Sequence, residues 1–373
     1  MKYFLRKLLF FIIPIILFLL SYEYVMHSLG ETSTIPTVFE IQERNRNSLF
    51  MRKYLSQDFR NYKLYGIKRN KPEILSSGSS RMMQIRSEFF NSTYYNAGGL
   101  LHNMRDLNNF LESDIKANTI LVGIDPWWFK YDNLKIRDKN KEFEFSKGKF
   151  DLTRYNSLID YHKIISDLTK ERISKNIGTN AQLFNGGFRL DGSLKTPDYR
   201  INLLLKEKKF IDIEEPKTSK RIKNGLTGRF SISKFDTLKF ENSIKLVKSL
   251  IDEGKNIIVY LMPFSNESYH TLVNTEKQKD LFEFATVHMP KVLDSYGIKY
   301  IPTEHPSLYK LDDTYFIDGF HPSEIFVAIQ LKRYASLFNN EIDPVKLDTL
   351  INNRFCNLLF NKSEMLTIYN ESD

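Results

Sequence analysis

The sequence predicts an α/β protein in which a parallel sheet is flanked by helices and carried on an N-terminal membrane helix. Two observations predict the sheet: short apolar runs recur along the chain, and segments with helical periodicity lie between them. A third observation, a continuous apolar stretch near the N-terminus, predicts the membrane helix. The chain has 373 residues, 42% of them hydrophobic, which is enough for one large domain or two small ones.

The apolar stretch runs from Leu8 to Leu20 and extends to Met26, with Glu23 as its one charge. A helix over these residues would be about 28 Å long, close to the thickness of a bilayer's hydrocarbon core. Basic residues precede it and acidic residues follow it, which predicts a single-pass anchor with a cytoplasmic N-terminus and an extracytoplasmic main domain, in the periplasm or at the cell surface. The alternative is a cleaved signal peptide, but no convincing small-residue cleavage site follows Leu20.

Strands and helices are expected to alternate after the anchor. The strands are predicted at residues 73–77, 93–96, 119–124, 256–262 and 298–302. The helices are predicted at residues 103–111, 241–251, 276–296 and 323–338. Pro290 should kink or split the third helix, and Ser323 should cap the fourth.

Residues 130–240 break this alternation, since they are charged, aromatic and only weakly periodic. The stretch is too long for an ordinary connection, so we expect an inserted subdomain or lid there. The predicted organisation is therefore a cytoplasmic tip and anchor at 1–30, a stalk at 31–70, an α/β domain at 71–345 that contains the insertion, and a tail at 346–373.

The net charge of +9 favours anionic surfaces, such as phospholipid headgroups or polyanionic polymers. No nucleic-acid-binding signature accompanies this charge, so nucleic acid is not an expected partner. Cys356 is the only cysteine of the sequence, which excludes an intramolecular disulfide and a cysteine-rich metal site. We expect neither a metal nor a cofactor.

Two polar patches that lie far apart in the sequence predict one active site. The first, GSSR at residues 78–81, follows the first strand, which would bring Ser80 to the carboxyl edge of the sheet. The second, DGFHPS at residues 318–323, places Asp318 three residues before His321, so that the carboxylate can hold one ring nitrogen while the other acts as a base. Each patch alone reads as an ordinary turn. Together they favour a serine nucleophile activated for acyl transfer.

Other segments offer an oxyanion hole and a substrate pocket. A helix beginning near Ser80 would direct backbone N–H groups at a developing oxyanion, and Gly98, after the second strand, offers a second amide. Trp127 and Trp128 follow the third strand, where they either contact a sugar or an acyl group or fill the core. Arg189, in the insertion, either grips a carboxylate or phosphate or is an ordinary surface arginine of a Gly-rich loop.

The blocks at residues 78–81, 96–98 and 318–321 resemble, in this order, the first, second and fifth blocks of the SGNH/GDSL hydrolase superfamily. The resemblance covers about residues 70–340 outside the insertion and implies a flavodoxin-like three-layer α/β/α fold. It is greatest to membrane-anchored members that modify bacterial cell-surface polymers.

The resemblance implies Ser80 as the nucleophile, His321 as the base and Asp318 as the group that orients it. It also implies the Ser80 and Gly98 amides as oxyanion donors.

Arg81, Asn96 and Asp125, each expected at the carboxyl edge of the sheet, are further candidates for substrate binding. Two positions depart from the family pattern. Ser79 stands where an aspartate is usual, and Asp125 stands where an asparagine usually donates to the oxyanion. An ionised carboxylate would repel an oxyanion, so Asp125 must point elsewhere, be replaced by another donor, or weaken the activity.

These features predict an extracytoplasmic serine esterase or O-acyltransferase that forms an acyl-Ser80 intermediate. Its substrate would be a cell-surface polysaccharide or an acylated small molecule, and a membrane-bound acyl-transfer partner fits the same prediction. Two alternatives stay open. One is a catalytically degenerate scaffold in envelope polysaccharide assembly, which Asp125 favours, and the other is a lipid-directed ester hydrolase held at the bilayer by the anchor.

Overall fold

Five strands form a fully parallel sheet in the computed structural model, which describes residues 2–55, 59–113, 115–130, 152–207, 217–225, 228–230 and 234–352. The strands are β1 (Ile74–Gly78), β2 (Tyr94–Gly98), β3 (Thr119–Ile124), β6 (Asn256–Leu261) and β7 (Tyr300–Ile301). Their order across the sheet is β2-β1-β3-β6-β7. All five predicted strands are thus confirmed, and the last is shorter than expected.

The register aligns the ends of the first strands. Gly78 of β1 lies opposite Gly98 of β2, and Ile124 of β3 lies opposite Leu261 of β6. The chain reverses its direction of progress across the sheet between β1 and β3, because β2 lies on one side of β1 and all later strands lie on the other. Ligands of open α/β sheets bind at the carboxyl ends of the strands beside such a switch point.

The chain divides into two compact units. The first comprises Met1–Tyr62 and Ser146–Leu190, and the second, which holds the sheet, comprises Lys63–Phe145 and Asp191–Asp373. Helices of the first unit are α1 (Lys2–Ser28), α2 (Ile35–Arg44), α5 (Tyr161–Thr169) and α6 (Thr179–Phe184), and α3 (Phe59–Asn70) spans the boundary. Helices of the second are α4 (Met104–Leu111), α7 (Asp198–Glu207), α8 (Thr218–Asn224), α9 (Thr237–Asp252), α10 (Asn266–Val273), α11 (Lys279–Glu283), α12 (Met289–Ser295), α13 (Glu324–Arg333) and α14 (Pro344–Asn352). Two short strands, β4 (Gly187–Phe188) and β5 (Leu194–Lys195), complete the described elements.

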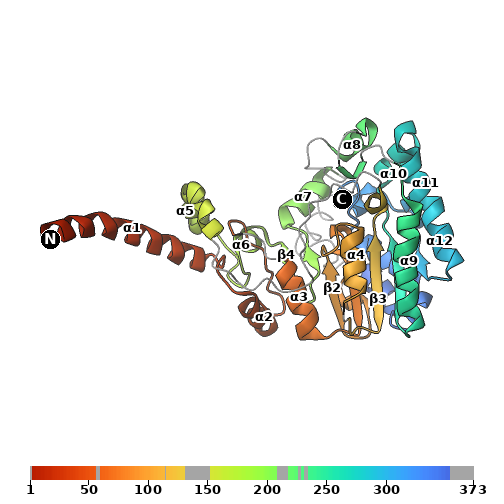
Figure 1. Ribbon diagram of the computed structural model, residues 1–373, viewed down its shortest axis with the longest axis horizontal. Coiled ribbons are helices and arrows are strands. Elements are labelled where there is room, and N and C mark those ends of the chain that lie inside the picture. The colour runs from red at the N-terminus through yellow and green to blue at the C-terminus, as the bar shows by residue number, and fades with distance from the viewer. Residues whose placement is uncertain are drawn as a thin grey trace, which may run out of the picture. The chain divides into compact units, whose positions relative to one another are not determined.

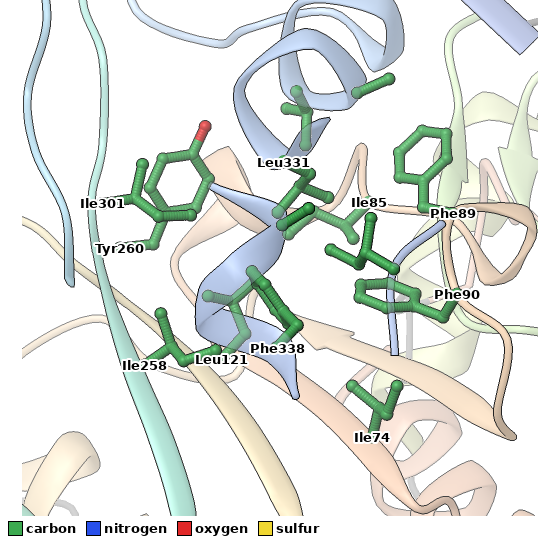
Figure 2. Close-up of a cluster of buried hydrophobic side chains, with 14 of the residues drawn as sticks. Ile74, Ile85, Phe89, Phe90, Leu121, Ile258, Tyr260, Ile301, Leu331 and Phe338 are labelled. Atoms are coloured by element: carbon green, nitrogen blue, oxygen red, sulfur yellow. The ribbon is translucent and has the colours of Figure 1, made fainter. Parts of the chain in front are cut away.

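Helices cover both faces of the five-stranded sheet. Helices α4 and α9 pack against each other over the face turned to the viewer in Figure 1. The other face carries a buried apolar cluster, in which Leu121 and Ile258 of the sheet meet Leu331 of α13 and Phe338 (Figure 2). Residues two apart on a strand point to the same face, which is why Ile258 and Tyr260 join this cluster together.

The predicted helices occur, but the one predicted over residues 323–338 ends at Arg333 and the one predicted over residues 276–296 is interrupted. Ser323 caps α13 as expected, since its hydroxyl accepts a hydrogen bond from the Phe326 N–H at 3.2 Å. The helix predicted over residues 276–296 is split by a π-helical turn, Phe284–His288, and Pro290 lies in the first turn of the following α12. Proline has no N–H for the preceding turn, so the backbone changes its hydrogen-bond pattern there.

Helix α1 is long and apolar enough to cross a membrane, and its apolar stretch is not buried by the rest of the protein. A signal sequence would have the same properties. Its last turns differ from its start, because Tyr22 and Met26 are fully buried in a cluster with Ile164 of α5. Just beyond the helix, the buried Glu31 carboxylate accepts hydrogen bonds from the backbone N–H groups of Lys53, Tyr54, Leu55 and Thr179. The end of α1 is therefore part of the core of the first unit.

Replacing Leu331 by alanine should lower the free energy of unfolding by about 2–5 kcal/mol, because it leaves a cavity in the cluster beneath the sheet. Val345→Ala on α14 is the control, since Val345 is 73% exposed and its loss should cost less than about 0.5 kcal/mol. Urea unfolding of the full chain measures both changes. Equal shifts for the two variants would contradict the placement of this core.

Candidate active site

The hydroxyl of Ser80 and the ring of His321 are in direct hydrogen-bond contact. The Ser80 Oγ lies 2.8 Å from the His321 Nε2, although the two residues are 241 positions apart. The other ring nitrogen, Nδ1, lies 2.7 Å from the Asp318 Oδ2. The predicted juxtaposition of these three side chains is therefore present. In this arrangement a proton can pass from the serine to the imidazole while the carboxylate fixes the ring.

Ser80 opens a single 3₁₀ turn, Ser80–Met82, directly after β1. A helix starting here would have directed its N–H groups at an oxyanion, but the turn ends after three residues and no α-helix begins at Ser80. Ser79 caps the turn through its hydroxyl, which accepts a hydrogen bond from the Arg81 N–H at 3.3 Å. As the first residue of the turn, Ser80 has a backbone N–H without a partner inside it.

Three glycines at the strand ends make room for Met82, the last residue of this turn. A Cβ on Gly78 would lie 2.5 Å from the Met82 Cγ, and one on Gly123 would lie 2.4 Å from the same atom. A Cβ on Gly98 would lie 2.9 Å from the Met82 carbonyl carbon. Distances this short do not occur between real side chains, so any larger residue would push the turn away from the sheet. The glycines of β1, β2 and β3 thus allow Met82, and with it the turn that contains Ser80, to pack closely against the ends of these strands.

The side chain of Asn96 forms hydrogen bonds with the backbone at the end of the same turn. Its side-chain amide donates to the carbonyl oxygens of Met82 at 2.9 Å and Ile85 at 2.7 Å, and its Oδ1 accepts the Gly98 N–H at 2.7 Å. The Gly98 amide, an expected oxyanion donor, is therefore already bonded to Asn96 here. The hydrogen bonds of the Asn96 side chain are all with backbone groups of the protein. Contact of this residue with a substrate stays a prediction.

The histidine is held by a tight loop before α13. Both the Phe320 and His321 N–H groups donate to the Asp318 Oδ1, at 3.0 and 2.8 Å. Burial alone would raise the pKa of Asp318, but the charge and hydrogen bond of His321, together with the two amides, hold it far below its ordinary value. Asp318 therefore stays ionised and keeps accepting from the imidazole.

Arg81, the residue after Ser80, is fully buried and connects its own loop to three others. Its Nη1 donates to the Asp125 Oδ1 at 2.8 Å, its Nε to the Phe320 carbonyl at 2.8 Å, and its Nη2 to the Pro263 carbonyl. Burial lowers the pKa of Arg81, and the adjacent Asp125 charge opposes that shift. The guanidinium thus joins the loops after β1, β3 and β6 to the loop that carries His321.

The carboxylate of Asp125 forms a buried ion pair with Arg81. Asp125 is 1% exposed and its ion pair with Arg81 offsets its charge beside the site. The guanidinium of Arg81 also lies over the rings of Trp127, at 5.4 Å, and Phe264, at 4.8 Å. Contact of Arg81 or Asp125 with a substrate stays a prediction, since their observed partners are internal.

The remaining predicted residues lie in different places. Trp127 is part of an aromatic cluster with Phe320 and Phe230, at ring-centre distances of 6.5 and 6.1 Å. Trp128 is 3% exposed, and none of the ring contacts among the described residues involves it. Arg189 belongs to the first compact unit, so its assignment to this site stays a prediction.

Sequence reasoning missed two residues that shape the site, Lys63 and Arg229. The fully buried Lys63 Nζ donates to the Asn96 carbonyl at 2.9 Å and to the Gly192 carbonyl. The guanidinium carbon of Arg229 lies over the rings of Phe320, at 4.4 Å, and Trp127, at 5.4 Å. Lys63 had no signal beyond its place in a mixed polar segment, whereas Arg229 directly precedes a stretch that contains three phenylalanines and was not singled out.

Comparisons with known proteins give no match: no family model, no curated protein and no solved structure resembles the chain significantly.

Arg81→Met should lower the free energy of unfolding by about 3–5 kcal/mol, because it leaves the buried Asp125 carboxylate without its counter-charge. Adding Asp125→Asn removes that isolated charge, so the double variant should regain part of the loss. Urea unfolding of the single and double variants checks this. A double variant no more stable than Arg81→Met would show that the ion pair is not the origin of the effect.

The buried ammonium of Lys63 predicts a pH-dependent stability. Burial lowers the pKa of Lys63 from 10.5 to about 7, against the opposing charge of Asp191. Between these values the unfolded chain binds the extra proton, so stability should rise with pH over this window and the penalty should be complete below pH 7. Relative to Lys63→Met, the wild type should gain about 2 kcal/mol between pH 7 and 9. Urea unfolding at both pH values measures this, and an unchanged difference between the two proteins would contradict it.

Proposed function

We propose that this protein is a membrane-anchored, extracytoplasmic serine esterase or O-acyltransferase of the SGNH/GDSL type. The observation that carries the proposal is the continuous hydrogen-bonded chain from the Ser80 hydroxyl through His321 to Asp318. Serine is a weak nucleophile until a base takes its proton, and this chain provides the base and its orienting carboxylate.

The position of these three hydrogen-bonded side chains in the fold supports the same proposal. The order of the strands across the sheet, β2-β1-β3-β6-β7, is that of flavodoxin-like sheets. Ser80 follows β1 at the carboxyl edge, beside the switch point between β1 and β3. This topology agrees with the fold that the SGNH/GDSL resemblance implies. Triads of this kind recur on unrelated folds, so the proposal depends on the geometry of the three side chains.

In the proposed first step, the Ser80 Oγ attacks the carbonyl carbon of an ester or thioester while the His321 Nε2 takes the hydroxyl proton. The tetrahedral intermediate collapses, the bond to the leaving group breaks, and His321 returns the proton to that group. The Ser80 N–H is one donor for the oxyanion. In the second step a sugar hydroxyl or water loses its proton to the His321 Nε2 and attacks the carbonyl carbon of the acyl-serine. The bond from that carbon to the Ser80 Oγ then breaks, and His321 returns the proton to the serine. The first acceptor yields an acylated polysaccharide and the second a free acid.

The charge of Asp125, which favoured a catalytically degenerate scaffold, is offset by Arg81. That pairing removes the main electrostatic objection to an oxyanion in this site. The membrane anchor is supported by α1, whose apolar stretch is exposed and whose last turns are buried in the first unit. Cleavage near Leu20 would expose that buried end, so we propose that the helix is retained.

A fluorophosphonate probe tests the nucleophile. The full chain in detergent micelles should be labelled, because the probe reacts only with a serine whose proton a base removes. Ser80→Ala should abolish labelling, and Asp318→Asn should slow it by on the order of 10⁴-fold, since the imidazole loses its orienting carboxylate.

Ser295→Ala is the control variant, because Ser295 is an exposed serine at the end of α12 and lies outside the proposed machinery. It should be labelled at the wild-type rate. Wild-type protein that is folded but unlabelled would contradict the proposed chemistry and favour the scaffold alternative. Comparing acetyl with long-chain esters then separates the acetyl-group reading from a lipid-directed hydrolase.

A further inference from the structure

Arg229, which pairs with no carboxylate among the described residues, lies beside the proposed active site. The Arg229 guanidinium carbon is 4.4 Å from the centre of the Phe320 ring, and that ring is 4.5 Å from the centre of the His321 ring. The guanidinium carbon and the centre of the imidazole ring are therefore at most about 9 Å apart, which is close to the Debye length of about 8 Å at physiological ionic strength, so salt screens their interaction only in part. Arg229 is half-buried, so solvent screens it less than a fully exposed side chain.

The charge of Arg229 differs from that of the other arginine of the site. Arg81 is neutralised by Asp125, whereas no carboxylate in the described part of the chain pairs with the Arg229 guanidinium. A second cation, Arg221, lies near the same ring, with its guanidinium carbon 5.9 Å from the centre of Phe320. Arg229 thus places near His321 a positive charge that none of the described carboxylates pairs with.

The position of Arg229 is fixed by its surroundings. Its carbonyl accepts a hydrogen bond from the buried Lys130 Nζ at 2.8 Å, and its guanidinium carbon lies over the rings of Phe320 and Trp127, 5.4 Å from the centre of the latter. The N–H groups of a guanidinium lie in one plane, where two of them can donate to the two oxygens of a carboxylate or phosphate. Trp127 and Phe320 are themselves buried, so their contribution is to position the guanidinium.

We propose that the substrate of this site carries an anionic oxygen group, a carboxylate or a phosphate, near its reacting ester or hydroxyl, and that Arg229 binds this group. The inference builds on the proposed function and specifies its substrate class. An anion on Arg229 would balance the charge of that guanidinium and hold the substrate near His321 and Ser80.

The test compares three aryl acetates with the full chain in detergent: phenyl acetate, 4-acetoxybenzoate and 4-acetoxyphenyl phosphate. Arg229→Gln should lower kcat/KM for the two anionic esters about 10- to 100-fold, mainly through KM, because a charged hydrogen bond is lost. Phenyl acetate should stay within about twofold, because its binding does not involve that bond. The larger of the two effects identifies carboxylate or phosphate as the preferred group.

Lys223→Gln is the matched control, since it removes the same charge from an exposed position on α8. It should leave all three esters nearly unchanged, and Arg229→Lys should keep part of the preference for anions. Equal losses for neutral and anionic esters in Arg229→Gln would overturn the proposal and make Arg229 a packing residue. A wild-type preference for phenyl acetate would overturn it as well.

A binding measurement separates this inference from the proposed chemistry. Ser80→Ala protein should bind 4-acetoxybenzoate or 4-acetoxyphenyl phosphate in calorimetric titrations, and the additional Arg229→Gln change should abolish that binding. If the wild type hydrolyses phenyl acetate through Ser80 but neither anion binds, the inference fails and the proposed function stands. If no ester is hydrolysed yet an anion binds through Arg229, the proposed chemistry fails and the anion site stands.

Discussion

The geometry of the site depends on one buried guanidinium. Arg81 connects the loops after β1, β3 and β6 to the loop of His321, and its partner Asp125 is equally buried. Because a buried charge without a partner is costly, these loops cannot move apart independently. The hydroxyl of Ser80 and the imidazole of His321, 241 positions apart in sequence, are thereby held at a distance that allows proton transfer.

The residues at the strand ends also restrict the position of the turn that contains Ser80. Met82 occupies the space that Gly78 and Gly123 leave open, and Asn96 bonds to the backbone on both sides of the turn's end. Lys63 in turn donates to the Asn96 carbonyl. These contacts are internal, so polar residues at the strand ends contribute to the position of Ser80 through the backbone that they hold.

The charges around the site separate into two groups with different consequences. Arg81 and Asp125 form a closed pair that organises loops, whereas Arg229 and Arg221 lie over Phe320 and face the region of His321. The net charge of +9 alone indicated only a general affinity for anions. The structure locates part of that charge next to the proposed reaction centre, where it bears on the choice of substrate.

The sequence by itself determined the α/β class, the five strands and the apolar N-terminal helix, because these depend on local periodicity and on runs of apolar residues. It also indicated Ser80, Asp318 and His321, since a strand end and a tight Asp-x-x-His loop are local features. Only the tertiary structure decided the partners of Asp125 and Asn96, the bonded state of the Gly98 amide, and the place of Arg229. Each of these depends on contacts between segments distant in sequence, and no local pattern specifies which buried groups will meet when the sheet closes its core.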